Sequence, residues 1–245
     1  MRTLLAPAKL TVSLRITGVR DDGYHLIDAE MVSLDLYDEL RITDGSGLTV
    51  RSDATGLTIP DDGDNLVERA LRTVDRTAAV ELLKRIPAGA GLGGGSSDAA
   101  AILRWAGGVS DEAAASIGAD VAFCQQGGRA RVRGIGEQVE PLPFEERRYT
   151  ILTPPFGAST PVVYAAWDAL GGPRGEAAND LEPAALAAYP ELAQWRDALK
   201  EASGQRAQLA GSGSTWFVEG VHPGIDVQGV AARVVSTVAG DATVS

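Results

Sequence analysis

The sequence predicts a mixed fold of α-helices and β-strands, and two patterns carry that prediction. Residues 10–16, LTVSLRI, place apolar side chains at alternate positions, which is the period of a half-buried strand. Residues 66–74 repeat apolar side chains at helical spacing behind Asn65, a good helix-capping residue. Proline and alanine then become more frequent in the last part of the chain, so we expect two domains, residues 1–147 and a more helical 148–245.

Composition and charge narrow the class of protein. The 245 residues are 44% hydrophobic and 22% charged, which is typical of a globular chain and not of a disordered or fibrous one. The 22 Lys and Arg against 33 Asp and Glu give a net charge of −11, which repels a nucleic-acid backbone. No apolar run reaches the ~18 residues of a membrane span, and Pro7 and Lys9 interrupt the N-terminal segment too early for a secretory signal. We therefore expect a cytoplasmic protein whose partners include neither nucleic acid nor membrane.

Cysteine and histidine are scarce. The chain has one cysteine, Cys124, and two histidines, which excludes an internal disulfide and leaves too few ligands for a soft-metal site. We expect no protein-built metal centre, and only a hard, oxygen-ligated ion such as Mg²⁺ fits this composition. Nothing in the sequence indicates an oligomeric state.

The segment with the most chemical information is Pro87–Asp98, PAGAGLGGGSSD, in which five glycines occur between Gly89 and Gly95. Glycine lets backbone N–H groups crowd around an anion because no Cβ atom intervenes. Residues 80–86 predict a strand before the loop and residues 97–106 a helix after it, so the loop leads into a positively polarised helix N-terminus. We interpret the loop as a phosphate cradle; the alternative is a tight glycine turn without a ligand.

Two other phosphate loops are excluded by the residues around this one. Gly89, Gly91 and Gly94 satisfy G-x-G-x-x-G, but a dinucleotide-binding unit needs a second strand that ends in an acidic residue about 20 positions later. Here the helix leads instead into a loop and a second helical stretch at 111–117. A Walker loop needs a lysine after its glycines, and G-x-x-x-x-G-K-[ST] occurs nowhere in the chain.

The loop resembles the second motif of the GHMP kinases, a superfamily of ATP-dependent small-molecule kinases. PAKLTVSLRI at 7–16 and LAGSGSTWFVE at 209–219 resemble the first and third motifs, in the same order. DGYH at 22–25, GADVAF at 118–123 and NDLEP at 179–183 are similar to the branch that phosphorylates a cytidine-diphosphate-linked methylerythritol. The resemblance covers almost the whole chain. It implies an α+β fold of two lobes with the active site in the cleft between them.

The resemblance also implies the substrates and where the nucleotide lies. ATP, accompanied by Mg²⁺, donates its γ-phosphoryl group to the 2-hydroxyl of the methylerythritol. Asn65 and Lys84 resemble contacts on the adenine side. The implied ATP-binding residues of the loop are Pro87, Ala88, Gly89, Ala90, Gly91, Leu92, Gly93, Gly94, Gly95, Ser96 and Ser97.

Transfer to an alcohol requires in-line positioning, a carboxylate near the attacking hydroxyl and positive charge near the phosphates. The resemblance implies that Asp120 orients or deprotonates the hydroxyl, and that Lys9 keeps Asp120 ionised while assisting the reacting group. From the residues alone, Asp120 could equally cap a helix or strand, and Lys9 could be a solvated surface side chain.

For the acceptor, Tyr24 and His25 resemble a pair that recognises cytosine, and Tyr164 resembles a second aromatic position. We also assign Thr160 and Thr11 to the acceptor site, with Thr11 standing where the family usually carries asparagine. Two alternatives stay open. Separation of Tyr24 from Tyr164 would favour a GHMP kinase for a different alcohol, and absence of turnover would indicate a nucleotide-binding homologue without activity.

Overall fold

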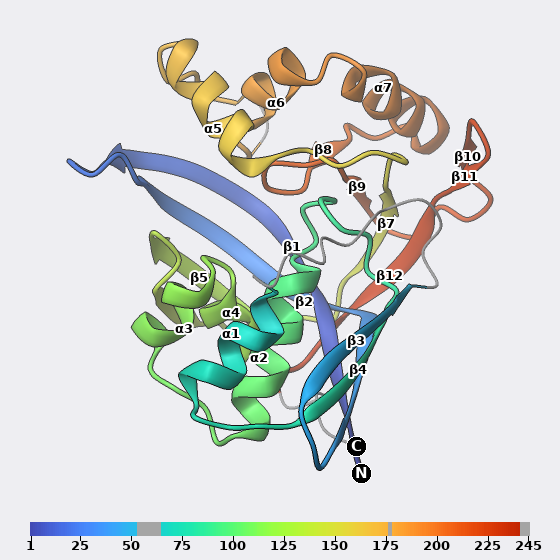
Figure 1. The fold of residues 1–245 in the computed structure, drawn as a ribbon. Helices are drawn as coiled ribbons and strands as arrows, with labels where there is room; N and C mark the ends of the chain where they lie inside the picture. The colour runs from blue at the N-terminus through green and yellow to red at the C-terminus, as the bar shows by residue number, and fades with distance from the viewer. Residues whose placement is uncertain (53–64, 176–177, 241–245) are drawn as a thin grey trace.

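The structure is a computed structural model that describes residues 1–52, 65–175 and 178–240. Its strands are β1 (Arg2–Val19), β2 (His25–Thr43), β3 (Gly47–Ser52), β4 (Ala79–Lys84), β5 (Arg129–Gly134), β6 (Gln138–Pro141), β7 (Arg148–Leu152), β8 (Gln208–Leu209), β9 (Trp216–Glu219), β10 (Asp226–Val227), β11 (Val230–Ala231) and β12 (Arg233–Val238). One sheet runs in the order β3-β4-β2-β12-β7-β9-β8, with β1 and β5 also paired to β2 and β6 paired to β5 (Figure 1). Strands β10 and β11 form a separate hairpin.

Strands β1 and β2 form a long antiparallel hairpin, and β1 extends beyond the alternating residues 10–16 on both sides. The reason is burial on two sides: residues 6–11 of β1 are all buried, so alternation disappears there. Ala6 belongs to one hydrophobic cluster, whereas Ala8 and Leu10 belong to the other. The hairpin therefore separates two parts of the core.

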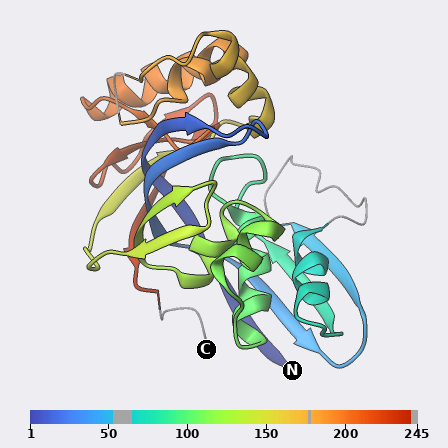
Figure 2. The ribbon, with the colours of Figure 1, turned by 90° about the vertical axis from the view of Figure 1, so that its left-hand side faces the viewer.

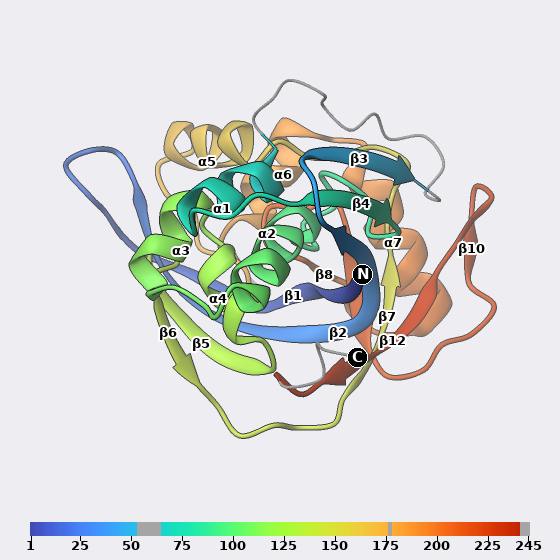
Figure 3. The ribbon, with the colours of Figure 1, turned by 60° about the horizontal axis from the view of Figure 1, so that its bottom comes forward.

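The helices form two groups on either side of this hairpin (Figure 1). Helices α1 (Leu66–Thr73), α2 (Gly94–Trp105), α3 (Asp111–Ile117) and α4 (Val121–Gln126) gather on one side, framed by β1, β2 and β5 when the molecule is seen from below (Figure 3). Helices α5 (Thr160–Ala169), α6 (Glu182–Ala188) and α7 (Leu192–Ser203) lie together on the other, and the tip of the β1–β2 hairpin passes beneath them (Figure 2). None of the described helices is long and apolar enough to cross a membrane.

Local signals explain several of these elements. Asn65 caps α1 by accepting a hydrogen bond from the backbone N–H of Val67 at 2.9 Å, as its residue type predicts. Helix α3 has the predicted bounds, and the glycine loop lies between β4 and α2, as expected. Helix α2 begins at Gly94, three residues before the predicted start, because packing of its alanine-rich face outweighs the low helix propensity of glycine.

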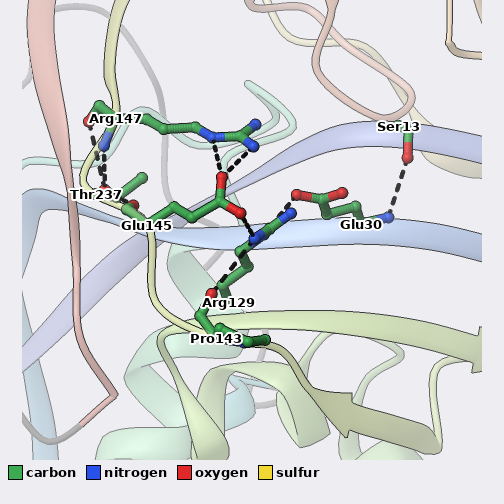
Figure 4. Close-up of polar contacts among 7 residues, drawn as sticks. All are labelled: Ser13, Glu30, Arg129, Pro143, Glu145, Arg147 and Thr237. Carbon is green, nitrogen blue, oxygen red and sulfur yellow. Dashed lines mark hydrogen bonds and ion pairs between the residues drawn. The ribbon is translucent and has the colours of Figure 1, made fainter.

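The segment between β6 and β7 is fixed to strands from both parts of the chain (Figure 4). Arg129 on β5 lies 2.8 Å from Glu30 and also pairs with Glu145, while Nε of Arg147 donates to Glu145 at 2.9 Å. The hydroxyl of Thr237 on β12 accepts from the N–H of Arg147 at 2.9 Å and donates to the carbonyl of Glu145 at 2.8 Å. Strand β12 pairs with both β2 and β7, so the sheet is continuous across the position of the expected boundary.

Candidate active site

A cavity of about 480 Å³ lies where the glycine loop meets residues from both ends of the chain. The sequence-predicted residues in its wall are Lys9, Asn65, Lys84, Pro87, Ala88, Gly89, Ala90, Gly91, Gly93, Gly94, Gly95, Ser96, Asp120 and Thr160. The wall also contains Asp98 and Ser212, which the sequence reasoning did not single out, and the apolar side chains of Leu66, Leu82 and Ile86. The cavity thus combines a backbone-rich floor with four ionisable side chains, Lys9, Lys84, Asp98 and Asp120.

The loop brings backbone donors to this cavity. Gly93 adopts a left-handed conformation, with φ at +67°, and its carbonyl accepts the first described bond of α2, from the N–H of Ser97 at 2.9 Å. The N–H groups of Gly94, Gly95 and Ser96 at the helix start have no partner within the helix, which is the arrangement that binds phosphate. A side chain at Gly93 would place Cβ 2.6 Å from Cγ of Lys9, so the glycine also makes room for that lysine.

Lys9 and Asp120 form the ion pair of the site. The β1–β2 ladder is interrupted between Pro7 and Lys9, and the N–H of Lys9 bonds instead to the carbonyl of Leu92 in the loop at 2.9 Å. Nζ of Lys9 then lies 3.2 Å from Oδ2 of Asp120 and donates to Oγ1 of Thr11 at 3.0 Å. The side chain of Lys9 is 6% exposed and that of Asp120 is 29% exposed. The ammonium group of Lys9 is therefore buried and fixed by Thr11, while the carboxylate of Asp120 stays accessible.

Asp120 occupies the first position before α4 but does not cap that helix with its side chain. Its carboxylate faces Lys9 instead. Burial and, second, the negative charge of Asp120 raise the pKa of Tyr164, which places the tyrosine within the electrostatic reach of the ion pair. The cap interpretation of Asp120 and the surface interpretation of Lys9 both disagree with these contacts.

The third motif, residues 209–219, packs against the glycine loop. An added Cβ at Gly91, whose φ is +77°, would lie 2.4 Å from the carbonyl oxygen of Ala210, so only glycine allows this approach. The N–H of Thr215 donates to the carbonyl of Ala90 at 3.1 Å. The buried amide of Asn179 donates to the carbonyls of Leu209 at 2.9 Å and Gly211 at 2.7 Å, so the NDLEP segment fixes this motif. The position of the third motif beside Lys9 depends on the hydrogen bonds of Thr215 and Asn179.

A buried charge cluster lies under the start of α2. The ammonium group of Lys84 pairs with Asp38 and, at 2.6 Å, with Asp98. Oδ1 of Asp38 accepts from the N–H of Ile86 at 2.8 Å and also from that of Arg85, which fixes the chain that enters the loop. Burial, opposed by the positive charge of Lys84 and reinforced by the negative charge of Asp38, raises the pKa of Asp98 to about 7.

Two loop residues do not reach the cavity wall. The hydroxyl of Ser97 donates to the carbonyl of Pro7 at 2.6 Å and is fully buried, so it joins the first and second motifs. Leu92 is buried in the core and offers its carbonyl to Lys9. Thr160 does line the cavity, and its hydroxyl lies 2.8 Å from that of Ser212. Ser212 belongs to the third motif, and its place in that glycine-rich segment is the sequence signal that points to it.

Of the predicted acceptor residues, Thr160 lines the cavity, whereas Thr11, Tyr24, His25 and Tyr164 do not. His25 contacts the ring of Tyr164, with centroids 4.7 Å apart, and the edge of Trp167 at 5.4 Å. Tyr24 is 59% exposed, and its ring faces the guanidinium of Arg20 at 5.5 Å. The structure therefore brings His25 against Tyr164, whereas Tyr24 is exposed and faces Arg20. Trp167 was missed, although it follows Tyr164 at helical spacing.

Chemically, the arrangement offers donors for phosphate oxygens, an accessible carboxylate and a buried ammonium group within one concave site. These are the parts that phosphoryl transfer to a hydroxyl requires: positioning, a proton acceptor and compensation of negative charge. The cavity size suits one nucleotide-sized ligand.

Comparison with known proteins agrees with this geometry. The family profile of the GHMP kinases N terminal domain matches residues 65–129. A 4-diphosphocytidyl-2-C-methyl-D-erythritol kinase of Paracoccus denitrificans (strain Pd 1222) is 40% identical over 233 residues, covering 86% of this chain and 84% of the relative. The kinase of that name from Pelotomaculum thermopropionicum (strain DSM 13744 / JCM 10971 / SI) is 38% identical over 251 residues, covering 88% of each chain.

Solved structures show the same fold. The crystal structure of a 4-(cytidine 5'-diphospho)-2C-methyl-D-erythritol kinase superposes with a TM-score of 0.74 at 29% identity, covering 96% of this chain and 98% of that one. The homoserine kinase from Cytophaga hutchinsonii ATCC 33406 superposes with a TM-score of 0.61 at 19% identity, covering 97% and 94%, and at that identity shows the fold alone. The predicted resemblance is confirmed: the chain belongs to the 4-diphosphocytidyl-2-C-methyl-D-erythritol kinase family of the GHMP kinases.

Proposed function

We propose that the protein transfers the γ-phosphoryl group of ATP to the 2-hydroxyl of 4-diphosphocytidyl-2-C-methyl-D-erythritol, giving ADP and the 2-phosphate in the non-mevalonate route to isoprenoid precursors. The observation that carries the proposal is the 3.2 Å ion pair of Lys9 and Asp120 in the wall of the cavity that the glycine loop also lines. In this cavity, a phosphate donor bound on the glycine loop can approach an alcohol that lies next to the Asp120 carboxylate. The relatives of this name, one of which is 40% identical over 233 residues, support the choice of acceptor.

In this proposal ATP lies on the glycine loop. The N–H groups of Gly94, Gly95 and Ser96, which have no partner within α2, bind phosphate oxygens with help from the helix dipole of α2. Asn65 and Lys84, which line the cavity, contact the nucleoside end. We further propose that residues 1–147 form the nucleotide-binding domain and 148–245 the C-terminal domain, which contributes Thr160 and Ser212 to the opposite wall of a cleft.

Asp120 accepts the proton of the 2-hydroxyl as the alcohol oxygen forms its bond to the γ-phosphorus. The bond from that phosphorus to the bridging oxygen breaks, and ADP leaves with the electron pair. Lys9 pairs with Asp120 and offsets negative charge on the phosphoryl oxygens. Thr11 keeps the ammonium group of Lys9 in place.

Mg²⁺ fits the donor set of the cavity, because the Asp120 carboxylate and the Ser96 hydroxyl are hard oxygen ligands. Among the described residues no group of three His, Cys, Asp or Glu side chains could hold a metal ion, so the ATP phosphates and water would supply most of the coordination. When bound, Mg²⁺ neutralises phosphate charge.

For the acceptor, we propose that His25 and Tyr164 receive the cytosine. Tyr24 would contribute the opposite aromatic face once the base replaces Arg20 as its partner. Tyr24 is exposed and faces Arg20, whereas Tyr164 faces His25, and this arrangement favours the rival acceptor, another small alcohol. A direct comparison of acceptors separates the two.

The test is an ATP-consumption assay with 4-diphosphocytidyl-2-C-methyl-D-erythritol, mevalonate, homoserine and galactose, with the product identified by ³¹P NMR. We expect a kcat/KM for the cytidylated acceptor at least about 100-fold above the others, because only that acceptor fills the aromatic site. Turnover of another alcohol in its place would assign a different GHMP substrate. ATP binding with no turnover of any acceptor would indicate the silent homologue.

A further inference from the structure

We propose that Asp168 on α5 is a positioning residue that fixes which ring nitrogen of His25 carries hydrogen, and thereby sets the selectivity for the nucleobase of the acceptor. This selectivity role presupposes the acceptor site proposed above, whereas the effect on His25 does not. Neither the sequence motifs nor the relatives assign a role to Asp168.

The contacts of His25 come from one face of α5. Nε2 of His25 lies 2.8 Å from Oδ1 of Asp168. The histidine side chain is 10% exposed, whereas that of Asp168 is 53% exposed. The ring of Tyr164 is tilted by 38° against the imidazole, and Trp167 meets it edge-on at 85°. Because Tyr164, Trp167 and Asp168 follow one another at i, i+3 and i+4, a single helix face supplies all three contacts.

The carboxylate determines the hydrogen on the ring. An ionised carboxylate accepts hydrogen bonds and cannot donate one, so the nitrogen that faces Asp168 must carry hydrogen. In the neutral ring, Nε2 of His25 therefore carries the hydrogen, and Nδ1 is the nitrogen that remains to contact a ligand. The two aromatic rings hold the plane of the imidazole, while Asp168 selects its tautomer.

Asparagine at position 168 separates the selection of the tautomer from the fixing of the ring plane. It has the size of aspartate, but its amide can donate as well as accept, so it no longer dictates which nitrogen of His25 carries hydrogen. The same change beside the histidine of a Ser-His-Asp triad preserves the geometry and selects the wrong tautomer. Because Asp168 is largely exposed, the substitution leaves the core intact.

A histidine with fixed protonation can distinguish pyrimidines. Cytosine has an amino group and an unprotonated ring nitrogen at the edge where uracil has a keto group and an N–H, so donors and acceptors are exchanged between the two bases. A site built to match one pattern leaves a buried polar group unpaired against the other. We therefore expect the wild-type chain to prefer the cytidine-linked over the uridine-linked acceptor.

The first test reads the tautomer in the ligand-free protein by imidazole ¹⁵N NMR. The chain has two histidines, and His222→Gln removes the second signal. At a pH where the ring is neutral, we expect hydrogen on Nε2 of His25 in the wild-type background and transfer of hydrogen to Nδ1, in part or in full, in Asp168→Asn. Identical ¹⁵N shifts in the two proteins would overturn the proposal, whatever reaction the chain catalyses.

The second test compares kcat/KM for the cytidine-linked and uridine-linked acceptors. We expect the ratio to fall about tenfold or more in Asp168→Asn, with KM for ATP unchanged and part of the ratio restored in Asp168→Glu. The matched control is Asp197→Asn, which removes an exposed carboxylate on α7 and leaves the ratio unchanged. A wild-type ratio in Asp168→Asn would overturn the selectivity role. Failure of the wild-type chain to use either acceptor would instead refute the proposed function, and the NMR result then decides the role of Asp168 alone.

Discussion

Nζ of Lys9 lies between two oxygen atoms, 3.2 Å from Oδ2 of Asp120 and 3.0 Å from Oγ1 of Thr11. Thr11 is almost fully buried and follows Lys9 by two residues on β1, so both side chains point to the same face of the strand. The threonine therefore supplies a fixed acceptor that aims the ammonium group at the carboxylate.

Thr11→Val removes that acceptor while it preserves the shape of the side chain. A hydrogen bond to a charged group contributes about 1.5–3 kcal/mol, so we expect kcat to fall by roughly 10- to 100-fold with little change in KM for ATP. Thr11→Ser is the control, because it keeps the hydroxyl and should retain most of the activity. Steady-state kinetics of the three proteins would contradict the role of Thr11 if the valine variant matched the wild type.

Gly91 is predicted to be intolerant of any side chain. A Cβ there would meet the carbonyl oxygen of Ala210 at 2.4 Å, whereas Gly204, with a similar positive φ of +69°, has nothing within 4 Å. Gly204→Ala therefore costs only the backbone strain, about 1 kcal/mol, and Gly91→Ala costs about 1–3 kcal/mol more. Urea unfolding measures both, and equal losses would show that the two motifs do not require this close approach. KM for ATP should rise in Gly91→Ala alone.

The glycine loop shows what the sequence could predict and what it could not. Its place between a strand and a helix follows from local patterns, and the pairing of Lys9 with Asp120 follows from the family motifs. The direction of the Ser97 hydroxyl toward Pro7 does not, because it depends on where β1 passes behind α2. The contact of His25 with Asp168 likewise depends on how α5 packs over the β1–β2 hairpin, which no local pattern encodes.

The same distinction applies to the fold. Helix α3 has a serine cap and helical spacing, so its bounds could be read from the sequence. The full length of β1 could not, because burial on both faces removes the alternation that marks a strand. The position of β12 between β2 and β7 is set by pairing between distant parts of the chain.

The pKa of Asp98, raised to about 7, predicts a pH-dependent stability. In the unfolded chain this carboxyl ionises near its ordinary value of about 3.9, so between about pH 4 and pH 7 the folded state binds more protons than the unfolded state. The contribution to the free energy of unfolding therefore falls as pH rises through this window. Asp98→Asn lacks that proton, and its urea-unfolding free energy should fall less steeply from about pH 5 to 7. Equal slopes in the two proteins would contradict the shift.

The linking segment in Figure 4 predicts a contrast between a buried hydroxyl and an exposed ion pair. Thr237→Val removes two hydrogen bonds to backbone groups of Glu145 and Arg147 in a largely buried position and should lower the free energy of unfolding by about 1–3 kcal/mol. Glu145→Gln weakens pairs at a 44% exposed carboxylate and should cost less than about 1 kcal/mol. Chemical denaturation measures both, and the reverse order would show that the charges, not Thr237, hold the segment.

The central claim is that Asp120 and Lys9 act on an alcohol next to ATP bound on the glycine loop. The most direct measurement is single-turnover phosphorylation of 4-diphosphocytidyl-2-C-methyl-D-erythritol by the wild-type chain and by Asp120→Asn, with ATP affinity measured in parallel. Asparagine keeps an acceptor for Lys9, so we expect unchanged ATP binding and a phosphorylation rate lower by roughly 10²- to 10⁴-fold. Equal rates in the two proteins would contradict the account.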